Sequence, residues 1–409
     1  MAYGDSPYDE ALQAAWKGFC ARLEDAGERV FKDDNPANGL QRADGFRLLA
    51  QNLGQAFDLA LETRNTKYPA IHAFSGPYCK LGGDCADFTY HQAWIDGESV
   101  YKISGNRGTA RFFNITVQGP RPEKMPGTDI RSLHEPFGDI PEANLFGHQL
   151  KTNWDGSFEL TIGGEKCGPN WLPTTPGSRK LFIRQGFDRW DEMPARMSIE
   201  RLGMDAPRPM PTPDELTAAM AWAGDFLGGM MKDWPEHSYL YSPLSTNPES
   251  ANVFPGGSNT DDDKKRGRLA ANMCWKIAAD EALIVEFDNH DGFWMLTNMG
   301  SFLTSMDYLY RPVSYTPSRT KVDSDGKVRL VLAHDDPGIH NWLDTQGFEL
   351  GNLTYRNLLS QTPTVLRTQL VKRAELAKAL PGDTATVTPD ERARQLHARF
   401  DGIRQRYGV

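Results

Sequence analysis

The sequence predicts a mainly β protein with α additions: a tandem pair of β-sandwich or jelly-roll-like units, an N-terminal helical pair, an inserted helix and C-terminal helices. Three observations carry this expectation. Alternating apolar and polar residues between tight turns indicate antiparallel strands in two separate regions. Helical periodicity marks the two ends and the passage between those regions. A length of 409 residues is enough for two core-forming units.

The first region, residues 1–66, is predicted to form two helices. Apolar residues recur at helical spacing over 11–30 and again over 41–63. Residues 67–210 are assigned to a first β unit. Its strands begin with a meander over 88–119, which is broken by Asp-Gly and by Gly-Asn-Arg-Gly turns.

An inserted region, residues 211–268, follows the first β unit. Thr212 is an N-cap, Pro213 occupies the first helical position and Glu215 completes a capping box, so a helix should begin here. The polar stretch 242–268 is rich in Gly, Pro, Asn and Asp. A loop of that length is either a functional lid or a linker, and the sequence leaves both open.

A second β unit is assigned to residues 269–362 and C-terminal helices to 363–409. The last helix should place Leu396, Phe400, Ile403 and Tyr407 on one face and arginines on the other. The C-terminal residues from Thr364 on carry nine Lys or Arg and five Asp or Glu. Such a basic tail is suited to a solvated helix face, to docking on its own chain, or to a homodimer contact.

A pattern within the first unit recurs in the second. Segments 155–184 and 325–356 each run from an Asp-Gly turn through an alternating strand and a loop to Asn-Trp-Leu, and then through a strand to an arginine. We interpret this as a duplicated β unit. Asn-Trp-Leu is then mainly structural: the Trp fills the base of the loop and the Asn bonds to its backbone.

The loops that precede the two Asn-Trp pairs differ. The first copy reads GGEKCGP, whereas the second reads HDDPGIH and so adds His334, Asp335, Asp336 and His340. A histidine beside carboxylates can act as a general acid or base, so these four are the candidate catalytic residues. The alternatives are a turn capped by the aspartates with His340 packed on Trp342, or a metal site.

Further residues could line a substrate site. Arg184 and Arg356 end equivalent strands, which favours a structural ion pair, although an arginine there could also clamp an anionic group. A catalytic Cys167 is disfavoured because no histidine follows it closely. Candidate substrate-binding residues are Arg356, Trp342, Trp171, Tyr90 and, on one predicted strand, Tyr308 and Tyr310.

The DGSFELTIGG…GPNWLPTTPGSRKLFIRQGF segment resembles the uncharacterised bacterial family called domain of unknown function twelve-fourteen, whose members show a DGS turn followed by NWLP. The C-terminal segment resembles a second, diverged copy with Asp344 where the motif has Pro. The resemblance implies a β-sandwich or jelly-roll-like domain with helical additions. It implies no settled reaction and no catalytic residues.

Composition limits the possible partners. The net charge of −9 disfavours nucleic acid and anionic membranes. No apolar run is long enough to cross a bilayer, and the chain begins without a secretory pattern. Five scattered cysteines without a CxxC pair indicate free thiols, so a cytoplasmic location is expected. No nucleotide-binding fingerprint or zinc-protease motif is present, so no cofactor is expected.

The sequence therefore favours a cofactor-independent acid–base enzyme, a lyase or hydrolase, that cleaves a C–O bond in a small, fairly apolar hydroxylated or glycosylated substrate. The alternatives are a non-catalytic saccharide-binding or assembly module and a metal-dependent hydrolase. An enzyme needs the two histidines of the second loop in an enclosed pocket. A saccharide-binding module needs an open strip of aromatic rings.

Overall fold

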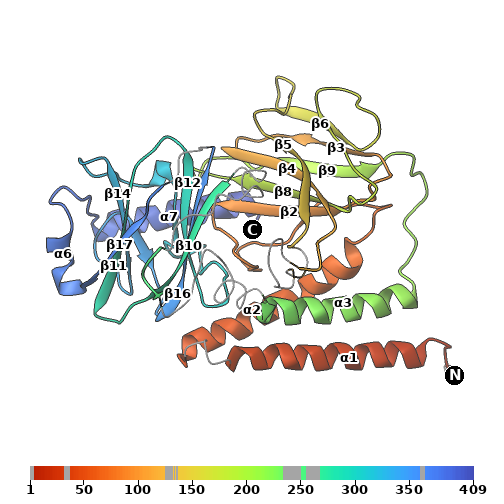
Figure 1. The fold of residues 1–409 in the computed structure, drawn as a ribbon, viewed down its shortest axis with the longest axis horizontal. Coiled ribbons are helices and arrows are strands. Elements are labelled where there is room, and N and C mark those ends of the chain that lie inside the picture. The colour runs from red at the N-terminus through yellow and green to blue at the C-terminus, as the bar shows by residue number, and fades with distance from the viewer. Residues whose placement is uncertain are drawn as a thin grey trace.

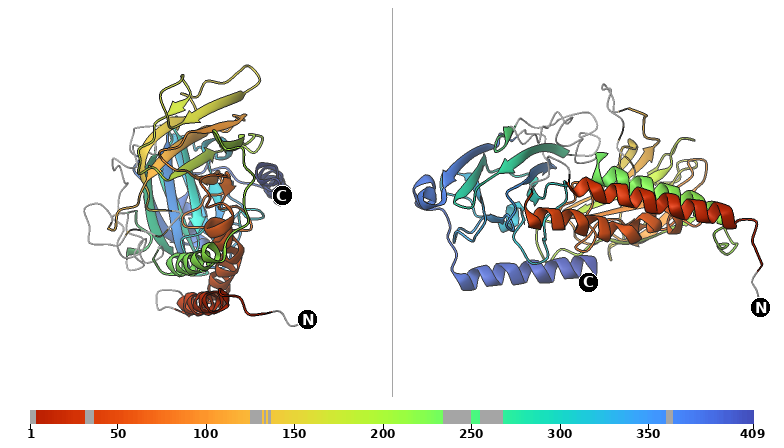
Figure 2. Two further views of the ribbon diagram at one scale, coloured as in Figure 1. Left: turned by 90° about the vertical axis from the view of Figure 1, so that its right-hand side faces the viewer. Right: turned by 90° about the horizontal axis from the view of Figure 1, so that it is seen from below.

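Two β units lie side by side, and a layer of helices covers one side of the first unit (Figures 1 and 2). Four sheets make up the two units, so the expected tandem β architecture is confirmed. The computed structural model describes residues 4–31, 37–124, 132, 134, 137–233, 250–254, 268–359 and 364–409.

The helical layer consists of α1 (Asp9–Glu28), α2 (Gly39–Phe57, followed by a π turn) and α3 (Pro213–Met231). Helix α3 begins with the expected capping box, in which Thr212 Oγ1 accepts from the Glu215 amide and the Glu215 carboxylate accepts from the Thr212 amide. Buried apolar side chains of all three helices form one cluster. The N-terminal helical pair and the inserted helix are thus confirmed, and they share one core.

The first unit is a sandwich of a five-stranded sheet, ordered β1-β2-β8-β4-β5, and a four-stranded sheet, ordered β7-β6-β3-β9. Alternate residues such as Ile115, Ile183 and Leu160 meet between the sheets and are fully buried. The strands are β1 (His72–Ala73), β2 (Phe88–Trp94), β3 (Tyr101–Asn106), β4 (Phe112–Gly119), β5 (Ile140–Phe146), β6 (Ser157–Ile162), β7 (Trp171–Leu172), β8 (Lys180–Gly186) and β9 (Arg196–Arg201).

The second unit has sheets ordered β10-β16-β12-β13 and β15-β14-β11-β17. Its last strand pairs antiparallel with β11, so this unit extends past residue 362 into the range predicted to hold only helices. The strands are β10 (Arg268–Lys276), β11 (Glu281–Asp288), β12 (Phe293–Met299), β13 (Ser314–Tyr315), β14 (Lys327–Ala333), β15 (Trp342–Asp344), β16 (Leu350–Leu358) and β17 (Arg367–Lys372).

The internal repeat is visible in matching hydrogen bonds. Asn170 bonds to the backbone N–H and C=O of Lys151 and to the C=O of Glu159. Asn341 makes the same three bonds, to Lys321 and to the C=O of Arg329. Both Asp-Gly turns place their glycine at φ near 80°. The duplicated β unit and the structural role of its asparagine are therefore seen directly.

A short connection before β2, the interdomain segment (residues 80–87), ties the first unit to the second. Lys80 Nζ donates to Ser305 Oγ at 3.1 Å, and the Asp84 carboxylate accepts from the Ser305 amide at 2.8 Å. Burial lowers the pKa of Lys80 to about 8, while the neighbouring Asp84 and Asp307 oppose the shift. The segment is therefore a buried polar contact between the units.

The last long helix, α7 (Pro389–Tyr407), follows the short α6 (Leu376–Ala379) and reaches from the second unit toward the first (Figure 1). Its Arg392, Arg399 and Arg406 are each at most 5 % exposed. The expected division of the helix into an apolar face and an arginine face is thus wrong for these three, because backbone carbonyls and Asp336 bind their guanidinium groups. Docking on its own chain is the observed use of this helix.

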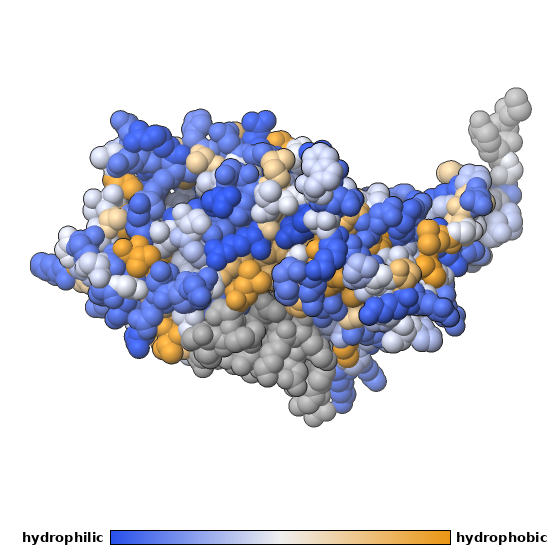
Figure 3. Space-filling view, turned by 90° about the horizontal axis from the view of Figure 1, so that it is seen from above, coloured by the Kyte–Doolittle hydropathy of each residue, from blue (hydrophilic) through white to orange (hydrophobic). Residues whose placement is uncertain are grey.

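The outer surface is mainly hydrophilic where Figure 3 shows it, with apolar residues scattered in small groups. Among the described helices, none combines the length and apolar content that a membrane span needs.

Candidate functional site

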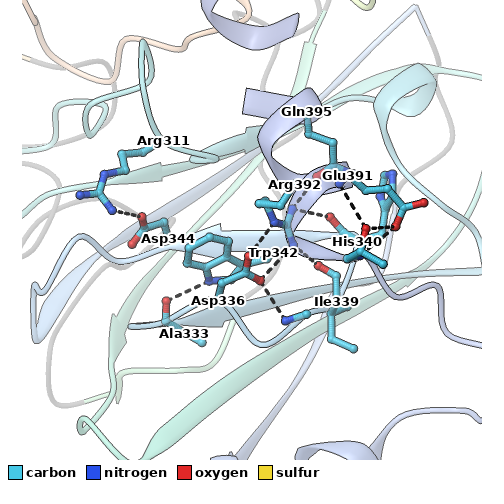
Figure 4. Close-up of polar contacts among 12 residues, drawn as sticks. Arg311, Ala333, Asp336, Ile339, His340, Trp342, Asp344, Glu391, Arg392 and Gln395 are labelled. Carbon is cyan, nitrogen blue, oxygen red and sulfur yellow. Dashed lines mark hydrogen bonds and ion pairs between the residues drawn. The ribbon is translucent and has the colours of Figure 1, made fainter. Parts of the chain in front are cut away.

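The four candidate catalytic residues lie on the loop between β14 and β15 (Figure 4 shows two of them, Asp336 and His340). The structure gives them different surroundings. His334 has both ring nitrogens in contact, Nδ1 with Thr345 Oγ1 at 2.9 Å and Nε2 with the C=O of Ile277 at 3.3 Å. A ring bonded on both sides within its own unit is placed for structure rather than for proton transfer.

The two aspartates each form an ion pair. Asp335 is exposed and pairs with Arg373 at 2.6 Å. Asp336 binds Arg392 through two oxygens, at 2.8 and 3.2 Å, and caps the amide of Gly338. Since the Arg392 side chain is only 7 % exposed, the pair with Asp336 holds α7 against the loop.

We expect Asp336→Ala to lower the free energy of unfolding by about 2 kcal/mol, because it leaves the buried Arg392 without a carboxylate. Asp335→Ala is the matched control, and it should change stability by no more than about 0.5 kcal/mol because its pair is exposed. Urea denaturation of both variants measures the difference. Equal losses would show that Asp336 does not hold the helix.

His340 is oriented by the repeat framework. Its Nδ1 lies 3.0 Å from Asn341 Oδ1, and that oxygen also accepts from the Lys321 amide. Because the Asn341 amide nitrogen donates to two carbonyls, its oxygen must face His340, so Nδ1 carries the proton. No described residue hydrogen bonds to Nε2. Burial lowers the pKa of His340, opposed by the Asn341 hydrogen bond, so the neutral form dominates at pH 7.

The ring of His340 forms part of the wall of a pocket of about 180 Å³ between the second unit, α7 and a loop of the first unit. A neutral imidazole with one fixed N–H and one unbonded nitrogen is the form that a general base requires. Further lining residues are Trp190, Pro312, Ser314, Tyr315, Arg319, Gln395, Leu396, Ala398 and Arg399.

Two larger pockets lie beside the helical layer, at about 570 and 400 Å³, and contain none of the sequence candidates. The larger one has four acidic and four basic residues in its wall, including the ion pair of Arg22 with Asp225 at 2.9 Å. The smaller one contains Arg64, whose guanidinium lies over Trp94 and Trp222. Neither pocket contains a histidine with a nitrogen oriented as that of His340 is, so the His340 pocket is the stronger candidate.

The two repeat tryptophans are framework rather than pocket wall. Trp342 is 6 % exposed, and its indole N–H donates to the C=O of Ala333. Trp171 is half-buried and donates in the same way to Gly163. Neither lines the His340 pocket, and the two do not form an open aromatic strip.

The two candidate tyrosines of the 306–316 region were expected on one strand, but only Ser314–Tyr315 is a strand there. Tyr308 is fully buried, with Lys80 Nζ over its ring, and Tyr310 is exposed and stacks on Phe400 of α7. Each side chain thus contacts another part of the chain, outside the pocket.

Tyr90 and Arg356 lie at the contact between the two units. As expected for neighbours on a strand, Tyr90 and His91 point to opposite faces of β2, and the Tyr90 ring stacks on Phe88. Arg356 donates to the C=O of Gly83 in the interdomain segment at 2.6 Å. Of the ten candidate site residues, only His340 therefore lines the pocket.

No group of three or more His, Cys, Asp or Glu side chains is placed to hold a metal ion in the described ranges. The candidate ligands His334, Asp336 and His340 instead bind Thr345, Arg392 and Asn341. Most of the polar stretch 242–268, for which a lid and a linker were both left open, lies outside the described residues.

Comparison with known proteins divides the chain into the same two β units that the structure shows. The sequence profile of the protein of unknown function family DUF1214 matches residues 86–185 and 258–361. The chain is a DUF1214 protein with two copies of the domain. The matched regions fall on the two β units, and the expected family resemblance is confirmed.

One solved structure supports the fold of this DUF1214 protein. An uncharacterised protein from Burkholderia cenocepacia is 27% identical, with a TM-score of 0.78 over 90% of this chain and 99% of that one. A Vibrio parahaemolyticus protein is 13% identical, with a TM-score of 0.42 over 86% of this chain and 100% of that one. No curated protein matches the chain.

The pocket residues that sequence reasoning missed come from three separate places in the DUF1214 protein. Trp190 follows β8, Arg319 follows β13, and Arg399 lies in α7. Only Arg399 had a usable signal, because Arg392, Arg399 and Arg406 recur every seven residues and therefore share one face of the helix. Nothing local in the sequence links Trp190 or Arg319 to the histidine loop.

Proposed function

We propose that this protein is a cofactor-independent acid–base enzyme, a lyase or hydrolase, that acts on a small molecule in the His340 pocket. The observation that carries the proposal is the His340 ring itself: Nδ1–H is fixed by Asn341, and Nε2 has no hydrogen-bond partner among the described residues. The first DUF1214 copy has Pro169 in the place of this histidine, so the fold does not need an imidazole there.

The proposed reaction cleaves a C–O bond. In an elimination, His340 Nε2 accepts a proton from the carbon next to the C–O bond, and the bond to oxygen breaks as the double bond forms. The imidazolium then donates that proton to the departing oxygen, so one histidine serves both halves of the reaction. In a hydrolysis, Nε2 accepts the proton of an attacking water instead. The apolar wall of Trp190, Pro312 and Leu396 suits a fairly apolar substrate body.

A reducing, cytoplasmic environment fits this proposal. All five cysteines are free, and Cys85 and Cys274 are buried, so no disulfide supports the fold. The proposed partner is a small molecule.

The pocket can be tested before any substrate is known. Ala398 is exposed on α7 and lines the pocket mouth, so Ala398→Trp should block the pocket without disturbing the core. Small hydroxylated metabolites are screened for a rise in melting temperature. A ligand at 100 times its Kd should stabilise the wild type by about 2.7 kcal/mol and the blocked variant by far less.

Ala393→Trp is the matched control, since Ala393 is exposed on the same helix and does not line the pocket. It should keep the full ligand response. A stabilising, turned-over ligand that acts equally on Ala398→Trp would place the active site elsewhere and overturn the proposal.

A further inference from the structure

Three guanidinium groups surround the indole ring of Trp190. The Arg319 carbon Cζ lies 4.0 Å from the ring centroid, that of Arg399 5.0 Å and that of Arg406 5.5 Å. Each ring contact is favourable to a cation, but three like charges around one indole repel one another. The cluster therefore needs negative charge nearby.

The chain supplies less negative charge than this cluster needs. Asp87 is fully buried and pairs with Arg319 at 2.5 Å. Arg399 and Arg406 form no ion pair with any described residue, and they donate instead to the backbone carbonyls of Ser314 at 2.7 Å and Ala86 at 2.8 Å. Asp87 is thus the one described carboxylate in an ion pair with these three cations, and Glu192 adds a weaker attraction to Arg406. A further anion would stabilise this arrangement.

Part of this arginine cluster also forms the wall of the His340 pocket. Arg319 and Arg399 both line the His340 pocket. Arg319 Nη1 is buried without a hydrogen-bond partner, and Arg399 donates through Nη1 and Nη2 to Ser314 alone among the described residues. Burial, with the charge of Arg319 as the next cause, lowers the pKa of Arg399 to about 10, as expected for an unneutralised buried cation.

We infer that the pocket takes a small monocarboxylate with a compact apolar body, whose anionic group is held by Arg399 and Arg319 beside His340. This inference rests on the proposed function and names its substrate class. Planar guanidinium groups match the geometry of a carboxylate. The volume of about 180 Å³ is close to that of a cavity of ~150 Å³ that holds benzene, which sets the size of the body.

The test uses benzoate as the probe and benzyl alcohol as its neutral counterpart of similar shape. In calorimetric titrations of the full chain at pH 7, benzoate should bind at least tenfold more tightly than benzyl alcohol. Arg399→Met should weaken benzoate binding at least tenfold and leave benzyl alcohol binding within about threefold. Arg399→Lys, which keeps the charge, should fall between the two.

Arg404→Met is the matched control, because Arg404 is exposed on the same helix, and it should bind benzoate as the wild type does. Arg399→Met should melt no lower than the wild type without ligand, since a buried cation without a carboxylate partner is removed. A purely structural arginine would give the opposite result, a lower melting temperature.

The inference is overturned if benzoate binds no better than benzyl alcohol, or if Arg399→Met keeps the affinity for benzoate. The proposed function fails separately, if carboxylates bind through Arg399 but no bound carboxylate is turned over in a way that depends on His340.

Discussion

His340→Gln is expected to reduce turnover at saturating substrate by about 10² to 10⁴-fold, the usual contribution of a positioned general acid or base. Glutamine keeps a side-chain N–H that can reach Asn341 Oδ1, so the loop should stay in place. What it removes is the ring nitrogen that has no hydrogen-bond partner among the described residues, on a side chain that lines the pocket. Turnover is measured on a substrate identified by the ligand screen, with the circular dichroism spectrum as the check on folding.

The pH profile provides a second readout of the same prediction. The neutral imidazole is the active form, and burial, reinforced by the charges of Lys321 and Arg392, lowers the pKa of His340 below its ordinary value of 6.5. Turnover should therefore be level near neutrality and fall only as the pH drops below about 6.5. His340→Gln should lose this acid limb.

His334→Gln is the control for both measurements. It lies on the same loop, but both of its ring nitrogens contact its own unit. It should keep turnover within about threefold and retain the acid limb. Full activity in His340→Gln would rule out the proposed mechanism, whatever the pocket binds.

The second large effect concerns stability and uses the internal repeat as its own control. Trp342→Ala should lower the free energy of unfolding by about 3 to 5 kcal/mol, because a ring that is 6 % exposed leaves a cavity in the core. Its loss also removes the surface under the Arg392 guanidinium, which lies 5.2 Å from the ring centroid. Trp171→Ala, at the equivalent half-buried position, should cost about half as much.

Urea denaturation of the full chain gives both values. The difference between the two losses of stability is more informative than either value. The two indoles make equivalent hydrogen bonds, Trp171 to the C=O of Gly163 and Trp342 to the C=O of Ala333, so the difference reports on burial. If the two variants were equally destabilised, the loss would come from that shared hydrogen bond and not from burial.

Local rules account for what the sequence predicts well. The capping box at Thr212, the Asp-Gly turns and the alternating strands of the duplicated unit each depend on a few neighbouring residues, and these form as expected. The duplicated sequence pattern also predicted that the chain has two similar β units, because two copies of one sequence fold in the same way. Strand β17 was missed, because it lies in the range assigned to helices and its partner β11 is far away in the sequence.

The internal repeat also allowed part of the candidate site to be predicted from the sequence. Comparing the two loops separated His340 from the framework Asn341, and that division agrees with the hydrogen bonds. The comparison could not tell His340 from His334, because their difference lies in which groups from other strands reach each ring. Trp190 could not be found at all, as only the docking of the first unit on the second brings it beside the loop, and Arg319 is brought there only by the folding of the second unit.

The interdomain segment has a consequence for synthesis on the ribosome. Its Lys80 is held by Ser305, 225 residues later, and its Ala86 by Arg406, 320 residues later. The first DUF1214 copy emerges early, yet these partners are translated much later. Synthesis of the second unit and of α7, rather than emergence of the first domain, is therefore the step that completes the native packing of that domain.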